Sequence, residues 1–283
     1  MQIFRTSENL REFVDSLRKE NKKIGFVPTM GALHFGHKSL IERAYEACDW
    51  VICSIFVNPT QFNDKTDLDK YPRTLEADIA LLSDFHDKLI IYNPEVSEMY
   101  PEHLEVEKVD FGYITSVLEA EFRPGHFDGM VDIVRRLLSH ANADVAFFGE
   151  KDYQQLAIIR KFVRDENIPT AIIGCPIVRE KDGLAMSSRN ARLSLEDRTL
   201  ALNINKALSF VKNAAKTGNI ADTLEEVKTK FFAHPNMRLE YIECVDSQTL
   251  EICETWNDTF EMICCVAIYV GDVRLIDNML VKP

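Results

Sequence analysis

The chain has 283 residues, of which 46% are hydrophobic and 28% charged, and this balance excludes an intrinsically disordered protein. Lys and Arg number 33 against 45 Asp and Glu, so the formal net charge is −12. Such an acidic balance argues against a nucleic-acid partner, because basic surfaces bind the phosphate backbone. A small anionic ligand in a local positive pocket remains compatible with it.

The first part of the chain alternates between amphipathic helices and short apolar strands. Ser7 is expected to cap the first helix. The expected strands are 23–28, 50–57, 89–92, 144–148 and 171–174, and the expected helices are 7–17, 38–48, 75–85, 131–141 and 153–165. The alternation predicts an α/β fold, a parallel sheet with helices on both faces, that binds ligands beyond the carboxyl ends of its strands. The polar segment 58–73 has no clear period.

The pattern changes after about residue 176. Helical stretches at 200–211 and 224–231 precede strand-like runs at 239–245 and 262–270. This order predicts a smaller α+β domain at the C-terminal end. We therefore expect two domains, residues 1–177 and 178–283, although the sequence places this boundary only to within several residues.

The cysteines and the N-terminus favour a cytoplasmic protein. Seven cysteines, several of them in apolar runs, form no CxxC pair and no zinc-type spacing with histidine. Buried, reduced thiols are therefore expected. The polar start of the chain is unlike a secretory signal, and the longest apolar stretch, 262–270, is too short to span a bilayer.

The strongest chemical signal is the segment PTMGALHFGH, residues 28–37, between a predicted strand and a predicted helix. Gly31 and Gly36 let the backbone approach a ligand closely. His34 and His37 converge on a helix N-terminus, where unpaired N–H groups favour negative charge, so the pattern indicates phosphate binding. It matches neither the P-loop nor the GxGxxG motif. A tight turn with two surface histidines is the alternative.

Two further segments carry groups that suit polyphosphate. FGEKDYQQ, residues 148–155, again joins a strand to a helix, with Lys151 as a cation, Asp152 at the helix start and the Gln155 amide one turn on. DGLAMSSRN, residues 182–190, offers Ser187, Ser188 and a guanidinium in a glycine-bearing loop. A capped helix and an ordinary interdomain loop are the alternatives.

Two weaker elements supply further polar side chains. Asn58 and Gln61 follow the second apolar strand, and their neutral amides suit hydroxyl or carboxylate groups. Arg123 and His126 lie in the turn RPGHF, which also fits a plain turn before a helix. The roles of Asn58, Tyr71, Arg123 and His126 stay open at this level.

Together these motifs closely resemble the pantoate–β-alanine ligase family, within the wider HxGH nucleotidyltransferase-like group. The resemblance rests on six segments in the family's order: PTMGALHFGHKSLI, FVNPTQF, DLDKYPRT, RPGHFDG, FGEKDYQQL and DGLAMSSRN. RLIDN near the C-terminal end is also similar. Phe35 departs from the family, which often has a polar residue there.

The resemblance implies an ATP-dependent ligase that joins pantoate to β-alanine, with pantothenate, AMP and pyrophosphate as products and a pantoyl adenylate as intermediate. It implies a Rossmann-type N-terminal domain, a smaller C-terminal lid, a homodimer, and magnesium held mainly by the ATP phosphates. No carboxylate cluster in the sequence is typical of a metal site made of protein side chains, so no metal ligand is assigned, and whether any side chain ligates magnesium stays open.

By matching motifs, the resemblance also implies site residues. The expected ATP contacts are Met30, Gly31, Ala32, Leu33, His34, Phe35, Gly36, His37, Gly149, Glu150, Lys151, Asp152, Val178, Met186, Ser187, Ser188 and Arg189. The expected catalytic groups are His34, His37, Lys151, Ser187, Ser188 and Arg189. Gln61 and Gln155 are expected to hold pantoate, and Gln61 to contact β-alanine as well.

Two other functions remain alternatives. An HxGH nucleotidyltransferase that moves AMP onto a phosphate acceptor would use the same loop but would not need Gln61 and Gln155. A nucleotide-binding regulator without turnover would explain the glycine loop but would leave Lys151 and the 187–189 segment without a purpose.

Overall fold

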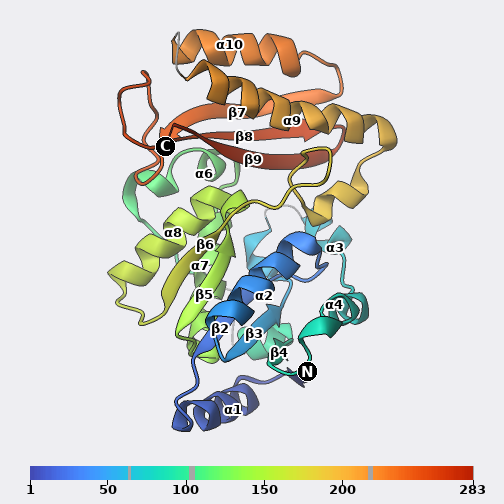
Figure 1. Ribbon diagram of the computed structural model, residues 1–283, viewed down its shortest axis with the longest axis vertical. Helices are drawn as coiled ribbons and strands as arrows, with labels where there is room; N and C mark the ends of the chain where they lie inside the picture. Colours follow the sequence, from blue (N-terminus) through green and yellow to red (C-terminus); the bar gives the residue numbers. More distant parts are fainter. Residues whose placement is uncertain (63–64, 102–105, 216–218, 283) are drawn as a thin grey trace. The chain divides into compact units, whose positions relative to one another are not determined.

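A computed structural model describes residues 1–62, 65–101, 106–215 and 219–282 (Figure 1). Two compact units divide the chain. The first contains Met1–Phe111, Arg123–Glu150 and Ile158–Pro176, and the second contains Gly112–Phe122, Lys151–Ala157 and Ile177–Pro283. The chain therefore passes between the units more than once, and the expected domain boundary after residue 177 stays a prediction.

The first unit is built on a six-stranded parallel sheet with the order β1-β4-β3-β2-β5-β6. Its strands are β1 (Gln2–Phe4), β2 (Ile24–Thr29), β3 (Trp50–Ile55), β4 (Leu89–Tyr92), β5 (Val145–Gly149) and β6 (Ala171–Cys175). The predicted α/β class with a parallel sheet is confirmed. The three-residue edge strand β1, which is largely exposed, was not predicted because it is too short to show a period.

Helices cover both faces of this sheet. On one face, Leu40, Ile41 and Ala44 of α2 (Phe35–Ala47) share a buried cluster with Val27 and Cys53 of the strands. On the other, α7 (His126–Ala141) packs against β2 and against α1 (Ser7–Lys19). Strand residues are thus buried on both sides, which explains their nearly continuous apolar sequence.

Helix ends differ slightly from the sequence prediction. Thr6, not Ser7, caps α1, because its hydroxyl oxygen accepts from the Asn9 N–H at 3.4 Å. The segment 58–73, for which no period was found, contains η1 (Pro59–Gln61) and α3 (Lys65–Lys70). The expected helix at 75–85 is divided into α4 (Leu75–Leu81) and η2 (Ser83–Phe85). Short helices give too few turns for a periodic pattern. The unit also contains α5 (Val96–Met99).

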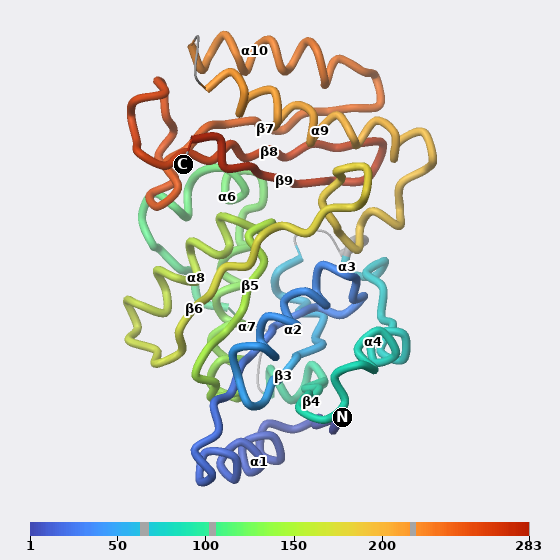
Figure 2. The backbone as a smooth tube through the Cα atoms, viewed as in Figure 1, coloured from blue at the N-terminus to red at the C-terminus, as the bar shows by residue number. Residues whose placement is uncertain are grey.

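The second unit is built on an antiparallel sheet with the order β7-β8-β9. Its strands are β7 (Met237–Asp246), β8 (Met262–Val270) and β9 (Val273–Lys282), and α9 (Leu195–Ala214) and α10 (Ile220–Phe231) pack with them around one core (Figure 2). The expected α+β character is confirmed. Strand β9 was not predicted, because Arg274, Asp277 and Asn278 interrupt its apolar pattern although the last two are buried.

Short segments from the middle of the chain complete the second unit. These are η3 (Gly112–Thr115), α6 (Glu119–Phe122), the part of η4 (Glu150–Asp152) that begins at Lys151, and the first turn of α8 (Tyr153–Asp165). Buried Gln154 of α8 ties them together: its amide nitrogen donates to the carbonyls of Ile114 and Val117, and its oxygen accepts from the Glu119 N–H at 2.9 Å. One amide thereby satisfies three backbone groups.

A buried ion-pair cluster joins the same segment to the sheet of the second unit. Both Nη atoms of Arg274 donate to the Glu119 carboxylate at 2.8 Å, and its Nε donates to Glu240 at 2.7 Å. The Tyr241 hydroxyl donates to Glu119 as well, and burial raises the pKa of Tyr241 well above its ordinary value. One guanidinium therefore compensates the buried carboxylate of Glu119 and the partly buried carboxylate of Glu240.

We expect Arg274→Met to destabilise the protein by about 3–5 kcal/mol, because it leaves the buried Glu119 and the partly buried Glu240 without their cation. The control is Arg238→Met, which removes an exposed guanidinium 4.0 Å from the Tyr269 ring centre; it should cost about 0.5–1 kcal/mol. Urea denaturation followed by circular dichroism measures both. Equal losses in the two variants would contradict the interpretation of the cluster.

Candidate active site

The loop that follows β2 has an unusual backbone conformation. Gly31 and Ala32 have φ angles of 77° and 48°, in the left-handed region, and His34 then forms the N-cap of α2. The Gly31 N–H donates to the Thr29 hydroxyl at 3.2 Å. A tight left-handed turn therefore delivers the chain to the first turn of α2 within a few residues of the strand.

His34 and His37 cap α2 reciprocally. Nδ1 of His34 accepts from the Gly36 N–H at 3.1 Å, and Nδ1 of His37 accepts from the His34 N–H at 3.3 Å. The two rings lie 4.0 Å apart between centres. Because both Nδ1 atoms accept, these contacts assign the proton of each neutral imidazole to Nε2, which can donate to an anion. The helix starts at Phe35 rather than near residue 38, and Phe35 is 62% exposed.

The carboxylate of Asp78, which the sequence motifs did not single out, binds the backbone of this loop. Asp78 of α4 is 2% exposed and accepts from the N–H groups of Ala32 at 3.1 Å and Leu33 at 2.8 Å. It follows the DLDKYPRT motif, but a lone Asp in a helical pattern carries no signal of a contact 46 residues away.

The loop lies where the strand order of the sheet reverses. Strands β2 and β5 are neighbours, whereas β3 and β4 continue outward on one side and β6 on the other. Because all strands are parallel, Gly149 at the end of β5 and Glu150 emerge at the same edge of the sheet as the loop after β2. Such reversal points are the usual ligand sites of open α/β sheets.

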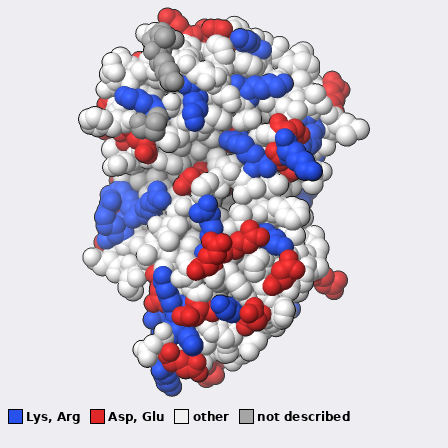
Figure 3. All heavy atoms as spheres, viewed as in Figure 1, with Lys and Arg blue, Asp and Glu red and all other residues white. Residues whose placement is uncertain are grey.

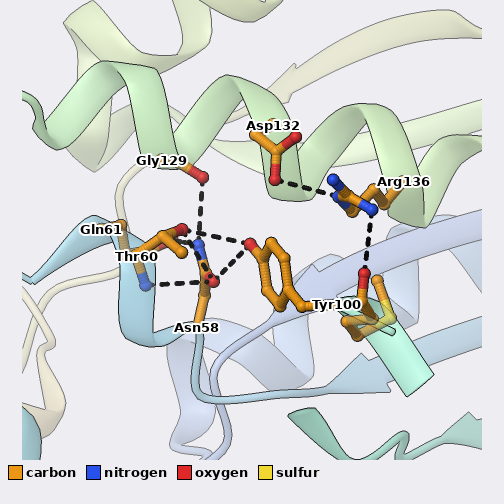
Figure 4. A network of polar contacts seen from close by, with 8 residues as sticks. Asn58, Thr60, Gln61, Tyr100, Gly129, Asp132 and Arg136 are labelled. Atoms are coloured by element: carbon orange, nitrogen blue, oxygen red, sulfur yellow. Dashed lines mark hydrogen bonds and ion pairs between the residues drawn. The ribbon is translucent and has the colours of Figure 1, made fainter. Parts of the chain in front are cut away.

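The amide of Gln61 contacts this loop. Its nitrogen lies 2.8 Å from the Met30 sulfur, and its oxygen accepts from Asn58 at 3.2 Å. The Asn58 side chain is buried; it donates to the Gly129 carbonyl at 3.0 Å and accepts from the Tyr100 hydroxyl at 2.8 Å (Figure 4). The sequence left the role of Asn58 open, and the structure shows that Asn58 orients Gln61.

Figure 4 shows how the network extends to α7. Tyr100 lies beside Arg136, whose guanidinium is 4.8 Å from the ring centre and pairs with Asp132 at 3.0 Å. Burial raises the pKa of Tyr100 to about 12, so its hydroxyl keeps its proton and serves as a donor. These contacts hold the Asn58 side chain in one orientation.

The RPGHF turn belongs to the same part of the first unit. Nδ1 of buried His126 contacts the Gln61 carbonyl oxygen at 2.9 Å, and its Nε2 lies 3.0 Å from Arg123. Tyr71 is buried and packs against Phe62, with ring centres 5.5 Å apart. Tertiary contacts thus define structural roles for three residues whose roles the sequence left open.

The second unit contains the other expected site residues. Lys151, Asp152 and Gln155 belong to it, within η4 and the first turn of α8. The Lys151 carbonyl accepts from the Asn278 amide at 2.9 Å. The neighbour of Gln155, Gln154, is the buried residue that anchors this turn.

The 178–190 segment has its own anchor in the second unit. Arg179 donates to both oxygens of Asp277, at 2.6 and 3.0 Å, and also to the Gly183 carbonyl at 3.2 Å. Burial raises the pKa of Asp277, while Arg179 and the Lys151 ammonium oppose this shift. Sequence reasoning missed Arg179 and Asp277, although Asp277 lies within the RLIDN motif.

Serines and an arginine follow this anchor. The Met186 N–H donates to the Val178 carbonyl at 3.0 Å, so these two expected ATP contacts lie together. Ser187 caps η5 (Ser188–Arg192), because its hydroxyl oxygen accepts from the Arg189 N–H at 3.3 Å. Ser187, Ser188 and Arg189 are all partly accessible. The expected ligand contacts are therefore divided between the two units, and their roles stay predictions.

Among the residues that the structure describes, no group of three or more His, Cys, Asp or Glu is arranged to hold a metal ion. None of the described helices combines the length and apolar character needed to cross a bilayer. On the face drawn in Figure 3, acidic side chains lie among the basic ones. All seven cysteines are free and buried.

A left-handed glycine loop and a paired-histidine helix cap at a reversal point of a parallel sheet are the arrangement expected of a nucleotide-binding α/β protein. Within this class, the sequence profile of the family described as pantoate-beta-alanine ligase matches residues 2–280. The chain belongs to this family, a family of ligases. The resemblance inferred from the motifs is confirmed.

Individual relatives agree with this assignment. The chain is 48% identical to a pantothenate synthetase of Phocaeicola vulgatus over 283 residues, covering all of both chains. It is 47% identical over 282 residues to one of Bacteroides fragilis, covering 100% of this chain and 99% of the relative.

Solved structures agree as well. The crystal structure of pantothenate synthetase from Thermus thermophilus superposes with a TM-score of 0.92 at 40% identity, over all of both chains. A pantoate-beta-alanine ligase from Francisella tularensis, complexed with beta-gamma ATP and beta-alanine, gives 0.82 at 36% identity and covers 99% of this chain and 98% of its own.

We expect Gly129→Ala to destabilise the first unit by about 1–3 kcal/mol and to disturb Gln61. An added Cβ would lie 2.3 Å from the Thr60 carbonyl oxygen and 2.8 Å from the Gln61 nitrogen, both of them backbone atoms that cannot rotate away. Gly149→Ala is the control, because its Cβ would meet nothing within 4 Å. Thermal denaturation compares them, and equal melting temperatures would contradict the close packing of α7 on η1.

Proposed function

We propose that this protein condenses pantoate with β-alanine at the expense of ATP, giving pantothenate, AMP and pyrophosphate through an enzyme-bound pantoyl adenylate. The single observation that carries the proposal is the reciprocal cap of His34 and His37 at the reversal point of the sheet, adjoining Met30 and Gln61. Membership of the family and the substrates in the family's name support the same reaction.

The first step activates a carboxylate. A carboxylate and an amine do not condense unaided in water, because an oxygen of the carboxylate would have to leave as hydroxide. In the proposed step, a carboxylate oxygen of pantoate attacks the α-phosphorus of ATP, the bond from the α-phosphorus to the bridging oxygen breaks, and pyrophosphate departs. Negative charge grows on the phosphoryl oxygens, so catalysis consists mostly of positioning and electrostatic stabilisation.

Several side chains of this protein are suited to stabilise the negative charge on the phosphoryl oxygens. The Nε2 protons of His34 and His37, together with the N-terminus of α2, would donate to the phosphate oxygens. Lys151 and Arg189 would supply positive charge, and the hydroxyls of Ser187 and Ser188 further donors. Gln61 and Gln155 would hold pantoate. Gln61 suits this role because Asn58 fixes its amide.

Magnesium would be held by the ATP phosphates, whose charge it would neutralise. The described side chains form no cage for a metal ion, and the steps above require none as its ligand. A homodimer and a cytoplasmic location remain part of the proposal. Seven free, buried thiols among the described residues suit a reducing compartment.

The second step forms the amide. The neutral amine of β-alanine attacks the acyl carbon of the adenylate, the bond to the phosphate oxygen breaks, and AMP leaves. The amine loses a proton in this step. Because an acyl adenylate hydrolyses readily, the site must exclude water while the amine approaches. The proposed covers are the segments 58–73, of which residues 63–64 lie outside the described residues, and 182–190.

ATP–pyrophosphate isotope exchange tests the proposal directly. With magnesium present and β-alanine omitted, the reaction should stop at the adenylate. Reversal of adenylate formation should then move labelled pyrophosphate into ATP, and this exchange should depend on added pantoate. A nucleotidyltransferase with a phosphate acceptor, or a binding protein without turnover, would show no pantoate-dependent exchange. That result would remove the adenylate mechanism.

We expect Lys151→Ala and His37→Ala each to lower kcat by about 10²–10³, as for the removal of one donor that stabilises developing charge. The fold should persist in both variants, which circular dichroism checks. Lys161→Ala is the matched control for Lys151, since Lys161 lies farther along α8 and pairs with Asp165 at its surface. Turnover near wild type in either site variant would refute the assigned role.

Gln155→Ala should weaken pantoate binding more than ATP binding. The Gln155 amide is expected to hydrogen-bond pantoate, whereas ATP has contacts along several other segments. Isothermal titration of each ligand measures the two changes separately. Equal loss for both ligands would contradict the assignment of Gln155 to pantoate.

A further inference from the structure

The carboxylate of Asp78 contacts the loop after β2 and the start of its own helix. Oδ1 accepts from the Leu33 N–H at 2.8 Å, and Oδ2 accepts from the Ala32 N–H at 3.1 Å. The Thr74 hydroxyl donates to Oδ1 at 3.1 Å. At 2% exposure, the Asp78 side chain is almost fully buried, and its carboxylate is occupied by the loop N–H groups and the Thr74 hydroxyl.

These contacts hold a backbone conformation that the sequence alone does not favour. Ala32 has a φ of 48°, in the left-handed region that is strained for a residue with a side chain. Hydrogen bonds from N–H groups to an ionised carboxylate are roughly twice as strong as those between neutral groups. The carboxylate therefore compensates the strain at Ala32.

The same contacts determine where the histidines lie. Leu33 precedes His34 directly, and the His34 N–H donates to Nδ1 of His37. A shift of the Leu33 peptide would therefore move the donor that sets the orientation and protonation of the His37 ring. Thr74 is the residue that precedes the first turn of α4, but its side chain does not cap that helix. Its hydroxyl serves Asp78 instead.

We propose that Asp78, oriented by Thr74, is a positioning residue for the His34–His37 pair: it fixes the left-handed loop so that both imidazoles donate from Nε2 to the phosphates. This inference rests on the proposed function. Asp78 acts through the loop backbone and makes no contact with the reacting atoms.

The decisive variant is Asp78→Asn, which keeps the shape but places an NH2 group against one of the two loop N–H donors. We expect kcat for pantoate-dependent ATP–pyrophosphate exchange to fall by about 10–100-fold, as for catalytic groups displaced by up to 1 Å. The KM for β-alanine in the complete reaction should change less than about threefold, because β-alanine enters after the step that the histidines assist.

Asp144→Asn is the matched control. The Asp144 carboxylate accepts from the Ile24 N–H at 2.7 Å, so it holds the opposite end of β2 in a similar way. This variant should lose thermal stability without losing kcat. Thr74→Val should lower kcat less than Asp78→Asn, and Thr74→Ser, which retains the hydroxyl, should restore it. If Asp78→Asn does not fold, the two Thr74 variants test the positioning role instead, and an unchanged kcat in folded Thr74→Val would refute it.

The outcomes separate two failures. Absence of pantoate-dependent exchange in the wild-type protein would refute the proposed function itself. Exchange in the wild type with an unchanged kcat in folded Asp78→Asn would refute only the positioning role. A melting temperature lowered without any change in kcat would likewise assign Asp78 to stability alone.

Discussion

The hydrogen bonds that His34 and His37 accept from the N–H groups of Gly36 and His34 cap the first turn of α2 and at the same time assign the protons of both rings. Helix N-termini are usually capped by Ser, Thr, Asp or Asn, whose oxygens accept from backbone N–H groups. Here two imidazoles take that function, each through Nδ1. A cap made in this way leaves the proton on Nε2, so that one arrangement completes the helix and prepares donors for phosphate.

The rest of the first unit holds this arrangement in place. The reversal of strand order between β2 and β5 brings Gly149 and the histidine loop to one edge of the sheet. Asp78 supports the loop from α4, and Gln61 adjoins it through Met30. The buried amide of Asn58 then connects Gln61 to α7. Each of these side chains satisfies backbone groups or neighbouring amides, so the site is supported by hydrogen bonds rather than by apolar packing alone.

The second unit uses buried ion pairs for the same purpose. Arg179 with Asp277 fixes the segment before Ser187, and Arg274 with Glu119 fixes the segment 112–122, to which Gln154 in the first turn of α8 is hydrogen-bonded. Both arginines bind a buried carboxylate from two nitrogens, an arrangement that restricts rotation more than a single contact does. These ion pairs therefore hold the backbone next to the segments that carry Lys151 and Arg189.

The sequence by itself determined the α/β class, most helices and strands, and the family, because apolar periodicity and the six ordered motifs are local properties of the chain. It could not reveal β1, which is too short for a period, or β9, in which Asp277 and Asn278 are buried polar residues.

Only the tertiary structure decided which groups support the site. The contacts of Asp78 with Ala32, of Asn58 with Gly129, and of Arg274 with Glu119 join residues 46, 71 and 155 positions apart. Single polar residues of this kind have no local pattern. Their partners are set by the order of the strands and by the burial that makes each hydrogen bond necessary.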